Sequence, residues 1–273
     1  MNGKHGLARG WRTGAGIACM AVWGGVMMSA ASASAAPFTA KQTVQLCDDD
    51  NYAPFAFNHQ GVASGATADW IRTVFDRLGI RYRITLMPWA RCLAYVRQGT
   101  FQIAMDAYYD SSRKGAFVYS KPFYTLTPQI YYSRKRYPDG LPVTTRNDLK
   151  QLHGCGLKGY SYANYGLQSS DLDTQSSDYA TLIRKVEFGL CDYLLEEQEV
   201  MRANLLFASR LSGDIGLGHE DAPGAVAPQL HFLLTRSGAF ASWMLPVLNQ
   251  QIDLTERGGL MRMLVDQTLS AEH

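Results

Sequence analysis

Residues 43–55 read Thr-Val-Gln-Leu-Cys-Asp-Asp-Asp-Asn-Tyr-Ala-Pro-Phe. Residues 43–47 are followed by a loop that is rich in acidic and aromatic residues. The run up to Cys47 predicts a strand. After the loop, Thr67 is expected to cap a helix, and Gly79 is expected to end it. The apolar residues of that helix recur three and four positions apart and are Ile71, Val74, Phe75 and Leu78.

The same change from strand to helix recurs along the rest of the chain. Further strands are expected over 82–87, 103–106, 155–158, 191–195 and 229–234. Helices are expected over 88–98, 179–189, from 196 onward and through 240–248. A turn-rich break at 138–142 separates two such blocks. This order predicts an α/β fold with parallel sheets, arranged as two α/β lobes that two crossing strands join.

The composition of the 273 residues is that of a folded protein, with 47% hydrophobic and 18% charged residues. Disordered chains have fewer apolar and more charged residues. The length is sufficient for two lobes that each bury a core of their own.

The first 36 residues have the three-part pattern of a secretory signal peptide. A basic start precedes an apolar stretch over 15–28, and small residues follow over 29–36. The alternative is a membrane anchor, but a spanning helix needs about 20 apolar residues, and this stretch is shorter. We therefore expect cleavage after Ala35 or Ala36 and a mature protein in the periplasm.

Removal of these 36 residues, which include three basic and no acidic ones, changes the formal net charge from +2 to −1. No basic tract remains that would favour nucleic acid or an anionic membrane as a partner. The cysteines show no CxxC spacing and the six histidines form no HExxH motif. We therefore expect neither a metal nor another cofactor.

Five motifs, taken in order, resemble those of the family 3 periplasmic solute-binding proteins, the polar-amino-acid receptors of ABC transporters. In that family a strand leads into an acidic residue, an aromatic residue and Pro-Phe, as at Asp49, Tyr52, Pro54 and Phe55. An arginine is followed seven residues later by Ser, then by Pro and aromatic residues, as in 113–124. The remaining motifs are 61–79, Met87-Pro-Trp89 and 99–104, where Gln102 stands in place of the family's usual Asp.

The second half of the chain agrees with this resemblance. Residues 148–162 resemble the segment with which the family enters its second lobe, and 189–192 resemble a strand of that lobe. The resemblance implies the type II two-lobed fold of these receptors. Its boundaries would be 1–36 for the signal peptide, 37–130 and 229–273 for lobe 1, and 131–228 for lobe 2, with hinges near 129–133 and 230–234.

The resemblance also implies how the chain would grip a zwitterion. Arg113 matches the arginine that holds the α-carboxylate through two parallel hydrogen bonds; the alternative is a surface arginine near a helix start. Glu197 matches the carboxylate that receives the ammonium group. Glu196, Glu197 and Glu199 share the alternative of a first-turn residue that the helix dipole favours.

Tyr52 and Trp89 match the two aromatic residues that flank the ligand side chain. Both follow strands, at the carboxyl ends where ligands collect in α/β sheets. Lys158, Tyr160 and Ser161 belong to a loop of lobe 2 that would add backbone donors. The alternatives are a core role for the aromatic residues and a plain tight connection for the loop.

The residues ahead of Arg113 depart from the family pattern. The family commonly has Gly and two Thr there, whereas this chain has Asp106, Tyr108 and Asp110. Asp110 is close enough in sequence to pair with Arg113, and it would then compete with a ligand carboxylate.

Acidic residues gather where the strands of lobe 1 are expected to end. They are Asp48, Asp49, Asp50, Asp106 and Asp110. A cleft with one sign of charge concentrates the opposite ion, so we expect basic or amine-bearing ligands to be preferred over glutamate or aspartate. The alternative is that these residues only cap turns and helices.

Four cysteines remain after the signal peptide, and an oxidising compartment allows three connectivities among them. We expect Cys47 to pair with Cys92 and Cys155 with Cys191, because each pair joins neighbouring elements of one lobe. Buried free thiols are the alternative.

Together these features predict an exported monomeric receptor for a small polar ligand, an amino acid or a related amine, which hinge closure would present to an inner-membrane ABC permease. Periplasmic cyclohexadienyl dehydratases resemble the same family. In that interpretation Glu197 or Glu199 would be a general acid with a raised pKa. A soluble sensor component is the third interpretation.

Overall fold

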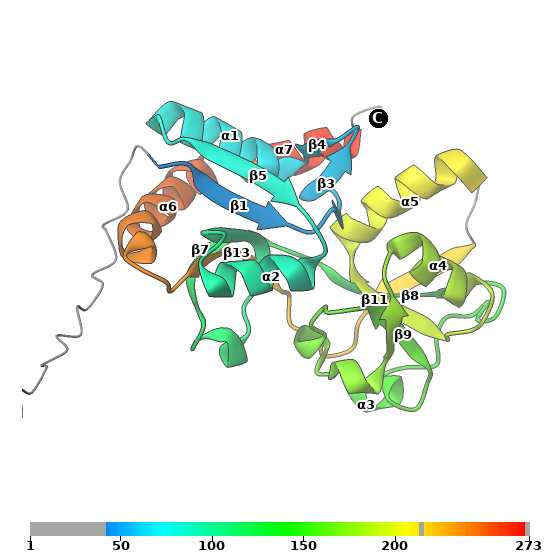
Figure 1. Ribbon diagram of the computed structural model, residues 1–273. Helices are drawn as coiled ribbons and strands as arrows, with labels where there is room; N and C mark the ends of the chain where they lie inside the picture. Colours follow the sequence, from blue (N-terminus) through cyan, green and yellow to red (C-terminus); the bar gives the residue numbers. More distant parts are fainter. Residues whose placement is uncertain (1–41, 213–215, 271–273) are drawn as a thin grey trace, which may run out of the picture. The chain divides into compact units, whose positions relative to one another are not determined.

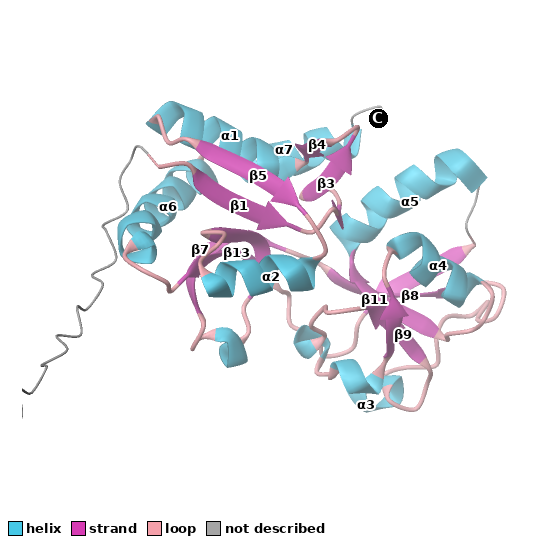
Figure 2. Ribbon diagram, viewed as in Figure 1, coloured by secondary structure: helices cyan, strands magenta, loops and turns pink. Residues whose placement is uncertain are grey.

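The computed structural model describes residues 42–212 and 216–270 (Figure 1), so the expected signal peptide lies outside the described residues. Two five-stranded sheets form the framework, and helices pack against both of them (Figure 2). The α/β fold class expected from the sequence is confirmed. The expectation of parallel sheets is wrong, because both large sheets combine parallel and antiparallel strand pairs. None of the helices in the described ranges combines the length and the apolar character that crossing a membrane requires.

The first sheet takes strands from both ends of the described chain. Its order is β5-β1-β6-β13-β7; β1 is parallel to β5 and β6, and β13 is antiparallel to β6 and β7. The bounds are β1 Val44–Asp48, β5 Tyr82–Leu86, β6 Ile103–Tyr108, β7 Phe117–Thr125 and β13 Gln229–Thr235. The carboxyl ends of β1 and β6 therefore meet at one edge of this sheet.

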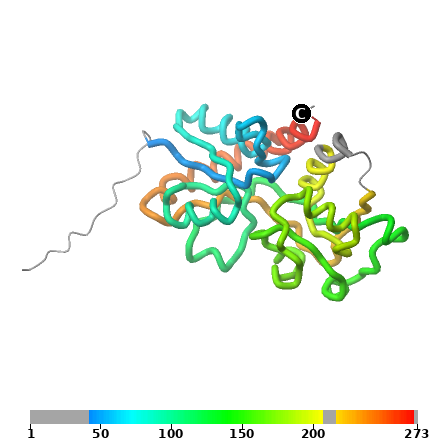
Figure 3. Tube along the Cα trace, turned by 45° about the vertical axis from the view of Figure 1, so that its right-hand side comes forward, coloured from blue at the N-terminus to red at the C-terminus, as the bar shows by residue number. Residues whose placement is uncertain are grey.

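Helices from both ends of the chain also meet around the first sheet. They are α1 Ala66–Leu78, α2 Trp89–Gln98, α6 Phe240–Arg257 and α7 Leu260–Ser270. Figure 3 shows the C-terminal α7 beside α1, with which it packs. As the sequence predicted, Gly79 and Gly99 end α1 and α2 in the left-handed conformation, with φ of 65° and 79°.

The start of α1 differs from the sequence prediction that Thr67 is its cap. Gly65 is the cap, and its φ is 110°. A Cβ atom at this position would lie 2.4 Å from the carbonyl oxygen of Phe55, so only glycine fits there. Thr67 is thereby placed inside the first turn, and its hydroxyl is free to serve another partner, described below.

The second sheet has the order β10-β9-β11-β8-β12 and comes from the middle of the chain. The bounds are β8 Pro128–Ser133, β9 Gly154–Leu157, β10 Asp173–Ser176, β11 Tyr193–Glu197 and β12 Leu217–Asp221. Its helices are α3 Arg146–Leu149, α4 Tyr179–Glu187 and α5 Gln198–Ser212. A small antiparallel sheet is made of β2 Asn51–Tyr52, β3 Ala56–His59 and β4 Val62–Ser64. The chain passes between the two large sheets after β7 and again before β13.

The sequence prediction that a helix begins at Glu196 is wrong. Glu196 and Glu197 are the last residues of β11, and α5 begins at Gln198. The strand continues because Glu196 pairs with Gln129 and Glu197 with Pro128 of β8. Both glutamates are consequently buried, at 3% and 2% exposure, rather than exposed in a first helical turn.

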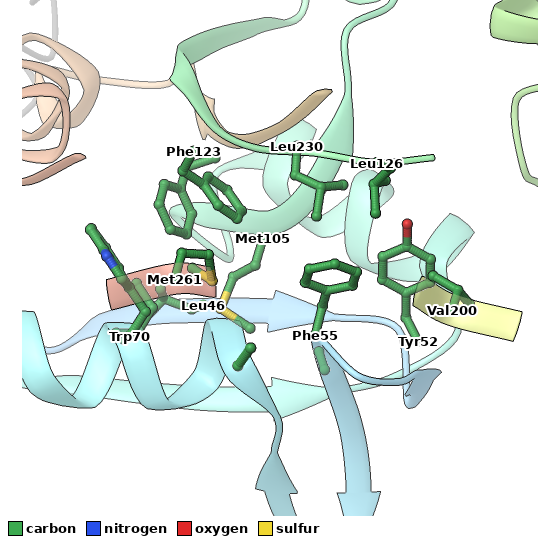
Figure 4. Close-up of a cluster of buried hydrophobic side chains, with 14 of the residues drawn as sticks. Leu46, Tyr52, Phe55, Trp70, Met105, Phe123, Leu126, Val200, Leu230 and Met261 are labelled. Atoms are coloured by element: carbon green, nitrogen blue, oxygen red, sulfur yellow. The ribbon is translucent and has the colours of Figure 1, made fainter. Parts of the chain in front are cut away.

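Aromatic residues form the centre of the core around the first sheet. Trp70 of α1 is fully buried, its ring centroid lies 5.2 Å from that of Phe232, and Phe232 stacks on Phe123 at 4.5 Å. Trp70 Nε1 donates a 3.0 Å hydrogen bond to Thr255 Oγ1, so burial leaves the indole nitrogen paired. Figure 4 shows Trp70 and Phe123 in this cluster. Each buried ring contributes about 1.5–3 kcal/mol to folding.

Candidate functional site

A small pocket lies where β1 and β6 end. It has a volume of about 40 Å³. Its lining residues are Asp48, Asp49, Tyr52, Trp89, Asp106, Tyr108, Arg113, Tyr160 and Ser161. The structure therefore brings together most of the residues that the sequence predicted for a ligand site. Asp110, Lys158 and Glu197, which were predicted with them, are described residues outside this lining.

Asp48 and Asp106 are the most deeply buried carboxyl groups of the pocket, at 1% and 5% exposure. Asp48 Oδ1 accepts a 2.7 Å hydrogen bond from the backbone N–H of Asp49, and Asp106 Oδ1 accepts one of 2.7 Å from Thr67 Oγ1. Within the described part of the chain, neither Oδ2 atom has a hydrogen-bond partner. Burial, followed by the charge of Asp106, raises the pKa of Asp48 well above its ordinary value, and burial raises the pKa of Asp106 to about 6.

The backbone of β6 directs the Asp106 side chain. Ala104 pairs with Leu233 and Ala107 with His231, so two residues of β6 stand opposite one residue of β13. This arrangement is a β-bulge, which locally bends a strand and changes the direction of a side chain. Asp106 lies in the bulge with φ of 51°, a left-handed conformation that aspartate and asparagine tolerate better than most residues.

Asp49 connects the pocket to a residue from the second half of the chain. Its Oδ2 accepts a 3.3 Å hydrogen bond from the hydroxyl of Tyr160, and its Oδ1 accepts one of 3.1 Å from the backbone of Asn51. Burial raises the pKa of Asp49 to about 6. The rings of Tyr160 and Tyr52 meet edge to face, with centroids 6.3 Å apart, and together with Trp89 they give the pocket aromatic walls.

Arg113 is the cationic residue of the pocket lining and ends the 3-10 turn η1, Ser111–Arg113. Its Nε atom lies 3.4 Å from Asp110 Oδ2. Burial raises the pKa of Asp110, but hydrogen bonds from Ser112 and the charge of Arg113 outweigh burial, so the pKa is lowered. Asp110 therefore contacts the guanidinium at its Nε atom.

Glu197 lies behind the pocket, where it accepts hydrogen bonds from three side chains. Its Oε2 accepts a 2.5 Å bond from Tyr108, and its Oε1 accepts bonds from Tyr165 at 3.2 Å and Asn164 at 3.4 Å. The hydroxyl of Tyr108 also contacts that of Tyr52 at 2.8 Å. Glu197, which was predicted to bind the ligand's ammonium group, thus accepts hydrogen bonds from phenol and amide groups of the protein.

The neighbouring glutamates have separate partners. Glu196 Oε2 accepts a 2.7 Å hydrogen bond from Tyr179, and burial, followed by the charge of Glu197, raises the pKa of Glu196 well above its ordinary value. Glu199 contacts Thr127 at 3.1 Å, at the first crossing between the sheets. Neither residue lines the pocket.

In the loop that follows β9, only part of the predicted donor set faces the pocket. Tyr160 and Ser161 line it. The backbone N–H of Lys158 instead donates to Ser176 at 2.9 Å, in the pairing of β9 with β10, and its side chain is exposed.

Sequence reasoning missed the donors that serve the buried carboxyl groups. Thr67 was interpreted as a helix cap, Tyr179 was interpreted as part of the apolar face of a helix, and Tyr165 gave no signal. Periodicity could not have found them, because the hydrogen bonds to Asp106 and Glu197 join residues 39 and 32 positions apart.

Each large sheet carries one disulfide. Cys47 of β1 is bonded to Cys92 of α2, with the Cα atoms 5.7 Å apart, and Cys155 of β9 is bonded to Cys191, with the Cα atoms 5.9 Å apart. The first bond ties α2 to the strand that carries Asp48. Ligand atoms of Cys191, His153 and Asp173 lie within 4.8 Å of one another. A disulfide sulfur is not a thiolate, so this group does not fit a metal site as it stands.

Solved structures with the same fold cover most of the chain. The arginine-, lysine-, histidine-binding protein ArtJ from Geobacillus stearothermophilus matches with a TM-score of 0.68 and 14% identity, over 85% of this chain and 96% of that one. A histidine kinase sensor domain with similarity to periplasmic binding proteins matches with a TM-score of 0.68 and 16% identity, over 84% of this chain and 96% of that one.

A third structure is the ancestral amino-acid-binding protein AncCDT-1, a precursor of cyclohexadienyl dehydratase. It matches with a TM-score of 0.66 and 17% identity, over 84% of this chain and 96% of that one. At such identities these likenesses establish the type II periplasmic-binding-protein fold. A comparison with curated protein sequences gives no match.

The sequence itself matches a family model. The model describes bacterial extracellular solute-binding proteins, family 3, and it matches residues 44–254. That range contains both large sheets and every residue of the pocket lining. The chain therefore belongs to the bacterial extracellular solute-binding proteins of family 3.

Proposed function

We propose that the chain is an exported solute-binding protein that captures a small polar ligand, an amino acid or a related amine, in the periplasm for an inner-membrane ABC permease. The observation that carries this proposal is a pocket in which one guanidinium and three carboxyl groups face the same space, between aromatic walls. A zwitterion needs partners of both signs, and aromatic rings bury its side chain.

Ligand capture requires the two parts of the pocket lining to separate, because the lining combines residues of both proposed lobes, such as Asp48 and Tyr160. Among the described residues, two side-chain hydrogen bonds away from the crossings, Tyr108 to Glu197 and Tyr160 to Asp49, join proposed lobe 1 (37–130 and 229–273) to lobe 2 (131–228). We infer that these bonds break when the lobes separate about the two crossings, and that closure on the ligand forms the state that the permease recognises.

A thermal-shift screen of the mature protein with amino acids, amines and small carboxylates tests this function. Ligand at about 100 times Kd stabilises the folded state by about 2.7 kcal/mol. For a chain of this size the melting temperature then rises by roughly 5–10 °C. A screen in which no polar metabolite raises the melting temperature would refute the receptor function.

A dehydratase is the second candidate. The sequence suggested Glu197 or Glu199 as its general acid, but the residue whose pKa burial raises, as a general acid requires, is the neighbouring Glu196. The ancestral neighbour that precedes such an enzyme has the same fold. Glu196 does not line the pocket, however, and its Oε2 is bonded to Tyr179. We therefore expect no aromatic product from prephenate or arogenate. Product formation by the wild type that Glu196→Gln abolishes would establish the enzyme instead.

A further inference from the structure

The carboxyl groups of Asp48 and Asp106 are incompletely satisfied in a way that points to a missing hydrogen-bond donor. Each has one oxygen fixed by a donor, Asp49 N–H or Thr67 Oγ1. The two Oδ2 atoms are buried, lack a partner within the described residues, and belong to side chains that line the pocket. A buried acceptor without a donor costs free energy, so these two oxygens call for a hydrogen-bond donor, either a shared proton or a cationic group of a ligand.

A single proton can satisfy both oxygens when no ligand is present. The two carboxyl groups lie within hydrogen-bonding reach of each other, but two ionised carboxylates offer no hydrogen to donate. We propose that Asp48 and Asp106 share one proton in the free protein and form a subsite for a side-chain ammonium group, which takes the place of that proton when the ligand binds. This inference rests on the proposed function of capturing a small polar ligand.

The exchange is balanced in charge and atoms. Before binding, the pair is one carboxylic acid and one carboxylate. The acid O–H bond breaks, the proton leaves for solvent, and the ammonium N–H groups donate to both Oδ2 atoms. The ligand keeps its own protons because an alkylammonium, with a pKa of about 10.4, stays charged in this pH range.

The groups around the pair favour a cation. Asp49 adds negative charge from the loop after β1, and Thr67 of α1 supplies a neutral donor. Tyr52, Tyr108 and Tyr160 line the same pocket, and burial raises the pKa of each, so they stay neutral. Arg113 of η1 is the cation facing this space, and Asp110 partly balances its charge.

Asp48 is the residue that gives up the proton. Thr67 donates to Asp106 and so favours its ionised form, whereas burial and the charge of Asp106 favour the protonated form of Asp48. Because the proton must leave before the ammonium group binds, affinity increases with pH by up to about tenfold per unit while the pair holds its proton.

The experiment uses matched probes: L-lysine, L-norleucine, which lacks only the ε-ammonium group, and cadaverine, which lacks the carboxylate. Titration calorimetry in two buffers with different ionisation enthalpies counts the protons released. For the wild type at pH 7 we expect lysine to release about one proton. We expect norleucine to bind at least about tenfold more weakly and to release none. Cadaverine should release the same proton as lysine, with an affinity that reports what Arg113 adds.

The variants Asp48→Asn and Asp106→Asn test the pair itself. Asparagine keeps the shape, donates a hydrogen bond to the remaining carboxylate, and tolerates the left-handed conformation at position 106. We expect both variants to fold, to release no proton, and to bind lysine at least about tenfold more weakly. Asp50→Asn is the matched control, because Asp50 is an exposed carboxylate in the same loop and outside the pocket lining.

The outcomes separate the two proposals. Lysine binding without proton release, or with the same release from Asp48→Asn, overturns the proton-sharing pair and leaves the receptor function standing. So does tightest binding to an anionic ligand, such as glutamate, in the thermal-shift screen. A screen in which neither these probes nor any other polar metabolite binds refutes the receptor function, and the ammonium subsite with it.

Discussion

The described residues include two pairs of buried carboxyl groups, one in each large sheet, and the pairs differ in their hydrogen-bond donors. Glu196 and Glu197 of β11 receive hydrogen bonds from three tyrosines and an asparagine. Asp48 and Asp106 of the first sheet receive one side-chain donor and one backbone donor, and each keeps an oxygen without a partner. Both pairs are equally buried, so burial does not distinguish them.

From this difference we infer that the glutamate pair is structural and that the aspartate pair is open to a ligand. Carboxylate oxygens that already hold protein donors have little to gain from an ammonium group, and losing those donors is costly. Oxygens without donors gain from any cation that reaches them. The family resemblance implied Glu197 as the partner of a zwitterion's ammonium group, whereas the donor pattern supports Asp48 and Asp106 as partners of a side-chain ammonium group.

The largest expected effect comes from removing the disulfides. It shows whether the two disulfides stabilise the sheets that carry the two carboxyl pairs to the same extent. A disulfide that closes a loop of 45 or 36 residues stabilises by about 4 kcal/mol on the chain-entropy account. We expect Cys47→Ser with Cys92→Ser, and Cys155→Ser with Cys191→Ser, to lose similar free energies of unfolding in urea. Non-reducing peptide mapping of periplasmic protein checks the pairing, and four alkylatable thiols would contradict it.

The next effect tests the glutamate pair as a structural unit. Glu197→Ala leaves the donors of Tyr108, Tyr165 and Asn164 without their acceptor, and we expect a loss of about 3 kcal/mol in the free energy of unfolding. Glu187→Ala is the control because Glu187 is exposed at the end of α4. If Glu197→Ala and Glu187→Ala have the same free energy of unfolding, Glu197 does not stabilise the fold and is again a candidate for contact with the ligand.

Arg113 should have a smaller effect, on binding alone. If its Nη atoms hold a ligand carboxylate, Arg113→Ala weakens lysine binding by at least about 2 kcal/mol, and cadaverine binding stays unchanged or improves. Arg91→Ala, an exposed arginine of α2, is the matched control. Calorimetric titrations compare the two. Equal losses for lysine and cadaverine would show that Arg113 supports the fold of the pocket rather than the carboxylate.

Asp110 provides the complementary variant. It contacts Arg113 through Nε, so Asp110→Ala should release this edge of the guanidinium, tighten binding of acidic ligands and loosen that of cationic ones. Unchanged affinity for both classes would mean that Asp110 does not compete with a ligand carboxylate.

The smallest effect is a pH dependence of opposite sign to ordinary acid denaturation. The pKa values of Asp48 and Asp106 are raised in the folded state, so the folded protein binds more protons than the unfolded chain above pH 4, and the pair costs more stability as pH rises. We expect the free energy of unfolding of Asp48→Asn to increase relative to that of the wild type by roughly 1 kcal/mol per pH unit between pH 5 and 7. Urea unfolding at both values measures this, and a constant difference would show that the pair holds no extra proton.

Much of the fold could be predicted from the sequence, because its signals are local. The periodicity of α1 and the glycines after α1 and α2 mark helix ends correctly within the chain segment itself. The end of β11 could not be predicted, since its two extra residues depend on pairing with Pro128 and Gln129 of β8. Glutamates favour a helix start locally, and the sheet overrides that preference.

For the site, residues that line the pocket could be predicted from the sequence, but their hydrogen-bond partners could not. Asp49, Tyr52, Trp89 and Arg113 were predicted from motifs, and all of them line the pocket. Which carboxyl groups lack donors depends on contacts such as Thr67 to Asp106, 39 residues apart, and no spacing rule encodes such contacts. That Asp49, Tyr52, Trp89 and Arg113 contact the ligand stays a prediction, which the binding experiments described above test for Arg113.

The bulge in β6 limits how this pocket could be redesigned. At position 106 the backbone has φ of 51°, so substitutions other than glycine or asparagine would have to adopt a strained conformation or shift the strand. Position 48 ends a regular parallel strand and carries no such restriction. A change of ligand charge by mutation is therefore far more accessible through residue 48 than through residue 106. Libraries aimed at new specificity should vary the first position and hold the second fixed.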